Sequence, residues 1–200
     1  LRHVSLPPRD LTKRPIVITS GSHSHARNCL QTVQAIPYLQ SELPPIFKFV
    51  GRYVHGIEED MKAQALKDGT NELLILDGMV PWEENFRRVA ESYCGCVFYA
   101  DNPNNRVGIP NRIFEYMFCG IPVVVSEFQE LKKIVETARC GVVVNSENPK
   151  DIARGIQYLL SHANGKRAME NKFGYHNDLN ILEKFYHKLK ENRTGKQRRM

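Results

Sequence analysis

The sequence lacks the segments that carry a protein into or across a membrane. No apolar run approaches the roughly 18 residues that a bilayer-spanning helix requires. The first ten residues, LRHVSLPPRD, contain no apolar core of a signal peptide and no initiating methionine. We therefore expect a piece of a longer, soluble chain. Its 200 residues, 42% hydrophobic and 25% charged, suit one folded domain.

Cysteine is sparse and is not spaced for a metal site or a disulfide framework. The five cysteines are an odd number among apolar neighbours, and Cys94-Gly95-Cys96 is one residue too short for the usual C-x-x-C motif. We expect buried, reduced thiols in a cytoplasmic protein. The sequence also offers no cluster of carboxylates, and we expect neither a metal nor a cofactor.

The net charge of +6 is concentrated at the C-terminus, where residues 193–200 hold four basic side chains and no acid. Such a tail can contact anionic lipid, which would place the protein at the inner face of the membrane, but a solvated terminus explains it equally well. No aromatic residues are interleaved with these charges and no nucleic-acid-binding motif is present, so nucleic acid is not an expected partner.

Short apolar runs alternate with amphipathic stretches along the chain. The expected strands are 15–19, 46–50, 72–76, 97–100, 122–126 and 141–144, and the expected helices are 27–39, 58–67, 82–93, 112–118, 129–137, 149–160 and 177–190. Strands that are apolar on both faces and alternate with helices predict a doubly wound, Rossmann-like α/β fold, with a parallel sheet of about six strands.

Ligands of such sheets bind beyond the carboxyl ends of the strands, so the loops at those ends are the candidate site. The first loop, residues 20–28, has small residues at Gly21 and Ser22, which let a ligand approach the backbone, and the guanidinium of Arg27, which suits a phosphate. It is neither a G-x-G-x-x-G motif nor a P-loop, and a polar surface turn is the alternative. In the loop 77–84, exposed backbone at Met79 and Val80 can hydrogen-bond the edge of a nucleobase.

The segment 101–125 is the most informative part of the sequence. Pro110 opens a helix with Asn111 and Arg112 in its first turn, so free backbone N–H groups and a guanidinium together form an anion site. Glu115 follows one turn later, within reach of a ribose attached to a bound diphosphate. A surface carboxylate is the alternative for Glu115, although its apolar neighbours favour a packed edge.

The run PNRIFEYMFCGIPVV (110–124), followed by Glu127, Glu130, Gly141 and the helix 149–160, resembles the C-terminal domain of family-four glycosyltransferases, which have the GT-B fold. The similarity extends in order over residues 15–189 and is strongest to the bacterial branch that builds capsules, lipopolysaccharide O-chains and related glycans. It implies a linker at 1–14 from a missing N-terminal domain, a nucleotide-sugar-binding domain at 15–175, a helix at 176–190 that crosses back to the missing domain, and a basic tail at 191–200.

The resemblance also implies roles for individual residues. Glu115 matches the second acid of the family's E-x7-E motif, which holds the ribose, and Arg27 matches a basic residue on the donor diphosphate. Met79 and Val80 lie where the main chain reads the base, and Gly21 is the loop glycine. The loop whose N–H groups meet the sugar and phosphates corresponds to Gly108, Ile109, Pro110, Asn111 and Arg112.

Two positions depart from the family pattern. Val107 stands where the first acid of the motif would contact a sugar hydroxyl, and Ser22 replaces a second phosphate-binding arginine. Arg112 is a candidate to supply the missing charge. Candidates to replace the missing acid are Asp101, Asn104 and Asn105.

The function implied is transfer of a sugar, with retention at the anomeric carbon, from a UDP- or GDP-sugar to a glycan or lipid-linked acceptor. Arg27, Arg112 and the helix N-terminus would stabilise the departing diphosphate without a metal. The acceptor site would lie in the missing domain, so this fragment alone is expected to be inactive. Three alternatives stay open: a non-catalytic nucleotide-sugar-binding module, a sugar-nucleotide epimerase of the same fold and a flavodoxin-like signalling domain.

Overall fold

The computed structural model describes residues 13–162, and these form a six-stranded, all-parallel sheet with the strand order β3-β2-β1-β4-β5-β6. The strands are β1 (Ile16–His23), β2 (Ile46–Tyr53), β3 (Leu74–Asp77), β4 (Cys94–Val97), β5 (Val123–Ser126) and β6 (Gly141–Val144). The predicted doubly wound α/β fold is confirmed. The strand order reverses between β1 and β4, which places a topological switch point in the middle of the sheet.

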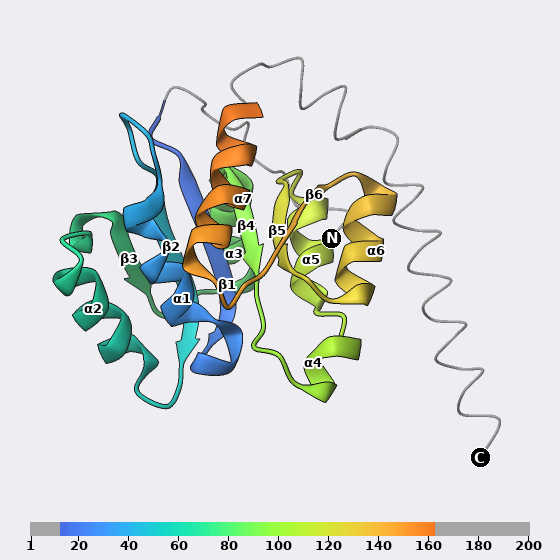
Figure 1. The fold of residues 1–200 in the computed structure, drawn as a ribbon, viewed down its shortest axis with the longest axis horizontal. Helices are drawn as coiled ribbons and strands as arrows, with labels where there is room; N and C mark the ends of the chain where they lie inside the picture. Colours follow the sequence, from blue (N-terminus) through green and yellow to red (C-terminus); the bar gives the residue numbers. More distant parts are fainter. Residues whose placement is uncertain (1–12, 163–200) are drawn as a thin grey trace.

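Helices cover both faces of the sheet (Figure 1). One apolar core lies under α1 (Cys29–Gln34), α2 (Ile57–Lys67) and α7 (Pro149–His162). The other lies under α3 (Trp82–Glu91), α5 (Asn111–Phe118) and α6 (Gln129–Ala138). The short helix α4 (Pro103–Val107) protrudes beside the carboxyl ends of the strands, and the 3-10 turns are η1 (His25–Arg27), η2 (Ile36–Tyr38) and η3 (Asn71–Leu73).

Local sequence signals explain where several helices begin. Pro149 is the first residue of α7, and the side-chain oxygen of Asn148 accepts a hydrogen bond from the backbone N–H of Lys150 at 3.0 Å. The side chain of Asn102 caps α4 in the same way, through the backbone N–H of Asn105. Pro81 precedes α3 and Pro110 precedes α5, each in an extended conformation that a proline favours before a helix.

The first strand is longer than predicted, and this changes the position of two candidate residues. β1 continues to His23, so Gly21 and Ser22 lie in the strand and not in the loop after it. The strand can continue because Gly21 pairs with Gly51 of β2, where a Cβ atom on Gly51 would lie 1.9 Å from the Gly21 carbonyl oxygen. Only a glycine at position 51 lets the two backbones lie this close, because the atoms that its Cβ would meet belong to the Gly21 backbone.

The helix predicted over residues 27–39 is wrong as a single element. Asn28 has left-handed backbone angles (φ 48°) and separates η1 from α1, which ends at Gln34 before the proline-containing turn η2. Arg27 therefore lies in the turn before the helix and not in its first turn. The strand predicted over 97–100 is also shifted, because β4 ends at Val97, and α4 was not predicted.

All five cysteines are buried and none forms a disulfide, as expected. Within the described residues, no helix combines the length and apolar character needed to cross a bilayer. The predicted linker up to residue 12, the crossover helix 176–190 and the basic tail 191–200 lie outside the described residues.

Candidate functional site

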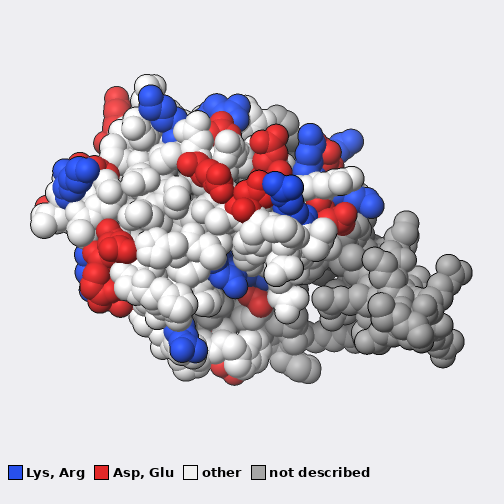
Figure 2. Space-filling view, turned by 60° about the horizontal axis from the view of Figure 1, so that its bottom comes forward, with Lys and Arg blue, Asp and Glu red and all other residues white. Residues whose placement is uncertain are grey.

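A cavity of about 650 Å³ opens at the carboxyl edge of the sheet, next to the switch point between β1 and β4. Its walls come from the ends of β1 and β2, the loop after β3, and the first turns of α3 and α5. This edge is at the bottom of Figure 1 and is turned towards the viewer in Figure 2, where the middle of the surface is largely uncharged and most charged side chains lie towards the rim.

The cavity brings together nine of the eleven candidate binding residues: Gly21, Ser22, Arg27, Met79, Val80, Pro110, Asn111, Arg112 and Glu115. Gly108 and Ile109 do not line it. The charged lining residues are Arg27, Arg52, Arg112 and Glu115, so three guanidinium groups face one carboxylate. The cavity is therefore electropositive and suited to an anion.

Arg112 is the most unusual of these side chains. It is 8% exposed, and its Nη1 atom is buried without a hydrogen-bond partner; no ion pair of Arg112 occurs among the described residues. The guanidinium lies against Gly21, whose φ is +106° and where an added Cβ would be 3.0 Å from Nη2 of Arg112. A buried, unpaired cation is costly, so the arrangement favours an anionic ligand that would pair with it.

The backbone at the start of α5 adds to this positive potential. The helix begins at Asn111, and Pro110 at its N-cap makes no side-chain capping bond, so the first N–H groups are not capped by a side chain of that residue. Partial positive charge at a helix N-terminus favours anions. Arg112 lies in this first turn and Glu115 one turn later, half-buried and lining the same cavity.

Arg27, which also lines the cavity, is held in place by Tyr99. Its Nη1 donates a hydrogen bond to the Tyr99 hydroxyl at 2.6 Å, and the guanidinium carbon lies 4.8 Å from the centre of the tyrosine ring. Tyr99 was not singled out in the sequence because it falls in the run 97–100 that was predicted to be a strand. It instead follows β4 and lines the cavity.

A buried network connects this wall to the loop after β1. The Ser126 hydroxyl contacts that of Ser146 at 2.7 Å and accepts a hydrogen bond from the Tyr99 backbone N–H at 2.9 Å. Ser146 also accepts a hydrogen bond from Nδ2 of Asn28 at 3.0 Å. Asn28 and Tyr99 are thus fixed to the same pair of hydroxyls. This network orders the residue that follows Arg27 in the chain and the residue that accepts its hydrogen bond.

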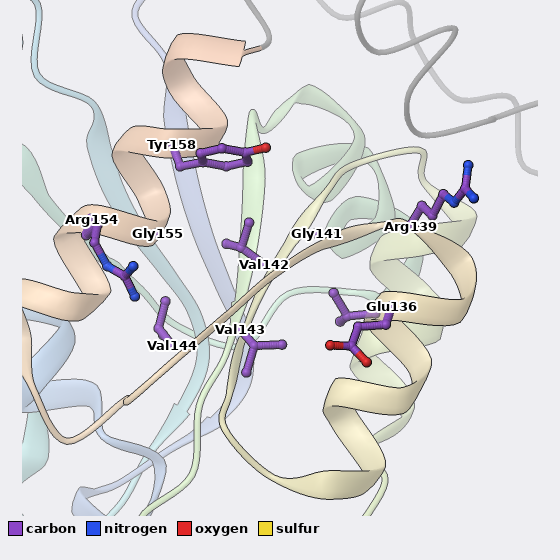
Figure 3. A pocket seen from close by; sticks show the side chains of 10 residues that line it. Glu136, Arg139, Gly141, Val142, Val143, Val144, Arg154, Gly155 and Tyr158 are labelled. Carbon is purple, nitrogen blue, oxygen red and sulfur yellow. The ribbon is translucent and has the colours of Figure 1, made fainter.

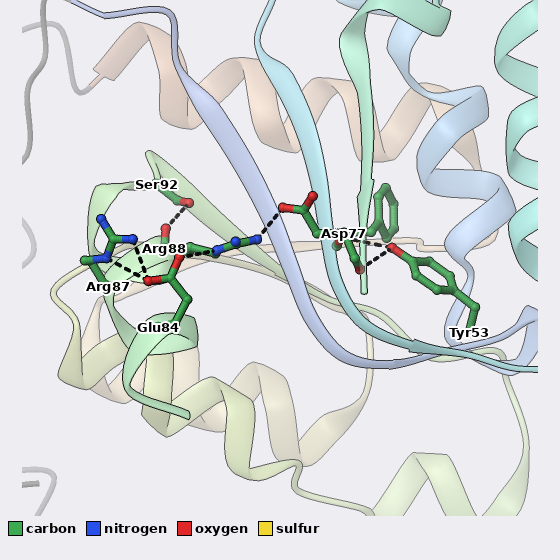
Figure 4. A network of polar contacts seen from close by, with 7 residues as sticks. Tyr53, Asp77, Glu84, Arg87, Arg88 and Ser92 are labelled. Atoms are coloured by element: carbon green, nitrogen blue, oxygen red, sulfur yellow. Dashed lines mark hydrogen bonds and ion pairs between the residues drawn. The ribbon is translucent and has the colours of Figure 1, made fainter. Parts of the chain in front are cut away.

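The far end of the cavity is formed by the loop between β3 and α3. Met79 is 79% exposed there, while Trp82 and Asn85 at the start of α3 complete the lining. Figure 4 shows how the loop is anchored: the Tyr53 hydroxyl lies within hydrogen-bond distance of the carbonyls of Asp77 (3.0 Å) and Phe49 (2.9 Å) and shares its proton between them.

On the other side of Asp77, its carboxylate pairs with Arg88, which also donates to Glu84 at 2.7 Å (Figure 4). Hydrogen bonds from Arg88 and Arg87 lower the pKa of Glu84. The exposed backbone at Met79 therefore projects from a loop whose beginning is fixed by β2 and α3.

His23, the last residue of β1, does not line the cavity. Its ring is fully buried against Phe49 and Tyr53, with ring centres 5.4 Å and 4.9 Å away, and its Nε2 has no hydrogen-bond partner. Burial, together with the nearby charges of Arg112 and Arg27, lowers the pKa of His23 to about 4. This histidine is a neutral core residue near neutral pH.

None of the residues considered as a replacement for the missing acid lines the cavity. Asp101 is paired with Arg106 at 2.6 Å. Asn105 donates its backbone N–H to the Asn102 side chain and its side-chain amide to the Ala100 carbonyl. Asn104 is exposed, as is Val107, at 73%.

A second cavity, of about 730 Å³, runs along the edge strand β6 between α6 and α7 (Figure 3). It is lined mainly by valines and backbone. Its two arginines, Arg139 and Arg154, lie well apart in Figure 3, and Arg154 is paired with Asp151. This cavity has no convergent charges like those at the carboxyl edge.

The fold and the cavity define a class: a doubly wound α/β domain with an electropositive ligand cavity at the switch point of its sheet. Residues 14–162 match the model of the family described as glycosyl transferases group 1. The chain belongs to this family.

Solved structures with the same fold include WaaG, HepE and TarM. WaaG, a glycosyltransferase involved in lipopolysaccharide biosynthesis, aligns with a TM-score of 0.64 and 15% identity over 82% of this chain and 43% of its own. HepE of Anabaena, in complex with UDP and glucose, aligns with a TM-score of 0.68 and 14% identity over 89% of this chain and 48% of its own. TarM of S. aureus, in complex with UDP and other ligands, aligns with a TM-score of 0.70 and 15% identity over 90% of this chain and 34% of its own.

At these identities the likeness establishes the GT-B type of fold. The chain spans about half or less of the length of these three proteins. Comparison with proteins of curated function finds no match.

Proposed function

We propose that this chain is the donor-binding, C-terminal half of a retaining family-four glycosyltransferase and that the carboxyl-edge cavity binds the diphosphate of a UDP- or GDP-sugar. The observation that carries the proposal is the buried, unpartnered guanidinium of Arg112, which lies in one cavity with Arg27 and Glu115. A diphosphate would supply the anion that Arg112 lacks.

The proposed roles follow from the positions of the residues. Arg112 and the α5 N-terminus would bind the diphosphate from one side and Arg27 from the other, and the Glu115 carboxylate would accept hydrogen bonds from the ribose hydroxyls. Backbone groups at Met79 and Val80 would bind the base. Gly21, which has no side chain, leaves room for the phosphates next to Arg112.

In the proposed reaction the bond between the anomeric carbon and the diphosphate oxygen breaks, and the electron pair stays on the diphosphate. Negative charge therefore grows on the leaving group, where Arg27, Arg112 and the N–H groups of α5 would stabilise it. The acceptor oxygen would form the new bond and lose its proton in a part of the enzyme outside this chain. Without that part the two substrates cannot be held together, so the fragment is expected to bind but not to transfer.

The solved relatives support parts of this proposal. HepE and TarM are described in complex with UDP, which favours UDP as the nucleotide, and WaaG is involved in lipopolysaccharide biosynthesis, which favours a glycan or lipid-linked acceptor. A cytoplasmic enzyme whose residues 176–190 cross back to an N-terminal domain and whose basic tail contacts the inner face of the membrane would fit such an acceptor.

A non-catalytic binding module is the second candidate, and the position of Val107 favours it. This residue stands where the family has a sugar-contacting acid, it is 73% exposed, and no other carboxylate than Glu115 enters the cavity within the described residues. Such a module would bind nucleotide but would not hold the sugar for transfer.

Calorimetric titration with UDP, GDP and their glucose and mannose conjugates tests the proposal. We expect one of the two nucleotides to bind, and Arg112→Lys to weaken that binding at least tenfold because an ammonium does not reproduce the guanidinium fork. Sugar transfer by the full-length enzyme, with the anomeric configuration of the product, would separate the enzyme from the module. Absence of binding to either nucleotide would overturn both.

A further inference from the structure

We propose that Arg52 is a third cationic ligand of the donor diphosphate, reaching it from β2. The inference rests on the proposed function of the cavity. Arg52 is the next-to-last residue of β2. It lies outside both segments that the sequence singled out, the motif at 110–124 and the loop after β1.

The register of the sheet places Arg52 next to the proposed phosphate site. Arg52 is the Cα partner of Ser22 in the parallel pair β1–β2, and Gly51 is the partner of Gly21. Partnered residues of parallel strands carry their side chains on the same face of the sheet. Arg52 and Ser22 therefore project to the same side, and both line the cavity.

The glycines bring the two strand ends and α5 into close contact. A Cβ on Gly51 would lie 1.9 Å from the carbonyl oxygen of Gly21, and a Cβ on Gly21 would lie 3.0 Å from Nη2 of Arg112. No side chain separates β2 from β1, or β1 from the guanidinium of Arg112. Arg52, which follows Gly51 directly, is thus one strand away from the site of the buried charge.

Arg52 is exposed and has no acidic partner among residues 13–162. Four other arginines of the described chain are each paired with a carboxylate: Arg87, Arg88, Arg106 and Arg154. Of the other two arginines in the cavity, Arg27 is bonded to Tyr99 and Arg112 is buried. Arg52 is the side chain of the three that is exposed and can move onto a bound anion.

The charge of the cavity is consistent with this role. Three arginines and one glutamate give the lining side chains a net charge of +2, and the diphosphate of a nucleotide sugar carries a negative charge on each phosphate. Without Arg52, the lining would be one positive charge short of neutralising that ligand. Ser22, whose hydroxyl is neutral, cannot supply the charge from β1.

Binding of UDP and GDP to the wild-type chain and to five variants tests the inference. Arg52→Gln should weaken binding of the preferred nucleotide about tenfold, and Arg52→Lys, which keeps the charge, should weaken it threefold or less. The double variant Arg52→Ser with Ser22→Arg moves the guanidinium from β2 to the partner position on β1. It should recover at least part of the affinity that Arg52→Ser alone loses. Arg139→Gln, an exposed arginine in the cavity at β6, is the matched control and should leave binding unchanged.

The outcomes separate the two proposals. If the wild-type chain binds neither nucleotide, the proposed function fails and Arg52 has no ligand. If the wild type binds but Arg52→Gln binds equally well, Arg52 is not a ligand and the proposed function stands. If Arg52→Lys loses as much affinity as Arg52→Gln, the positive charge of residue 52 does not contribute to binding, and the inference is overturned.

Discussion

The guanidinium of Arg27 donates a hydrogen bond to the Tyr99 hydroxyl at 2.6 Å while lying 4.8 Å from the centre of the same ring. Residue 27 precedes a helix that covers one face of the sheet and residue 99 follows β4, so the contact spans the switch point. It fixes a side chain that would otherwise lose rotamer freedom on binding an anion. Part of the cost of ordering Arg27 is therefore met before the ligand arrives.

Removal of the Tyr99 hydroxyl should weaken nucleotide binding without unfolding the protein. We expect Tyr99→Phe to lower the affinity for UDP or GDP about threefold to tenfold, because Arg27 loses its hydrogen bond but keeps the aromatic face. Titration calorimetry measures the effect. In a double-mutant cycle with Arg27→Ala, the loss from Tyr99→Phe should largely disappear. Additive losses would mean that Tyr99 does not act through Arg27.

Arg112 should stabilise the complex with the nucleotide and destabilise the protein without it. Replacement by methionine removes a buried charge that has no partner in the described residues, so we expect the free energy of unfolding of the empty protein to rise by about 1 kcal/mol or more. The same variant should lose nucleotide affinity by about a hundredfold. Thermal unfolding with and without UDP measures both effects. A lower melting temperature of empty Arg112→Met would show that the guanidinium already has a compensating partner.

The sequence predicted the sheet and most of the cavity because the relevant signals are local. Short apolar runs that alternate with amphipathic stretches located the strands, and Pro110 and Pro149 located helix starts to within a residue. Since the carboxyl ends of parallel strands share one edge, three loops could be assigned to one site without coordinates. Arg27, Arg112 and Glu115 do meet in one cavity.

What the sequence did not indicate depends on pairing between distant segments. The continuation of β1 through Ser22 requires the glycine pair with β2, and the place of Arg52 requires the register of that pair. The contact of Tyr99 with Arg27 requires β4 to end at Val97, before the apolar run does. No composition or periodicity of a single segment contains this information.

The glycine pair at the strand ends should tolerate no side chain. Gly51→Ala places a Cβ 1.9 Å from the Gly21 carbonyl at a residue whose φ is +140°, so we expect a loss of about 3 kcal/mol or more in the free energy of unfolding. Urea denaturation measures the loss. Gly78→Ala is the matched control: no atom lies within 4 Å of its added Cβ, and we expect a change below about 0.5 kcal/mol. Equal behaviour of the two variants would contradict the close approach of β1 and β2.

The buried His23 should make the protein less stable in mild acid. Burial lowers the pKa of His23 from 6.5 to about 4, so the folded chain keeps this ring neutral while the unfolded chain takes up a proton below about pH 6.5. The contribution of neutral His23 to the free energy of unfolding is therefore fully present above pH 6.5 and is lost as the pH falls towards 4. Between pH 7.5 and pH 5.0 the difference in pKa corresponds to about 2 kcal/mol from this residue. Urea denaturation at the two pH values, on the wild type and on His23→Phe, isolates it: the variant should lose about 2 kcal/mol less than the wild type over this interval. An identical loss in both proteins would mean that His23 is already protonated when folded, or that it has a partner that holds its proton.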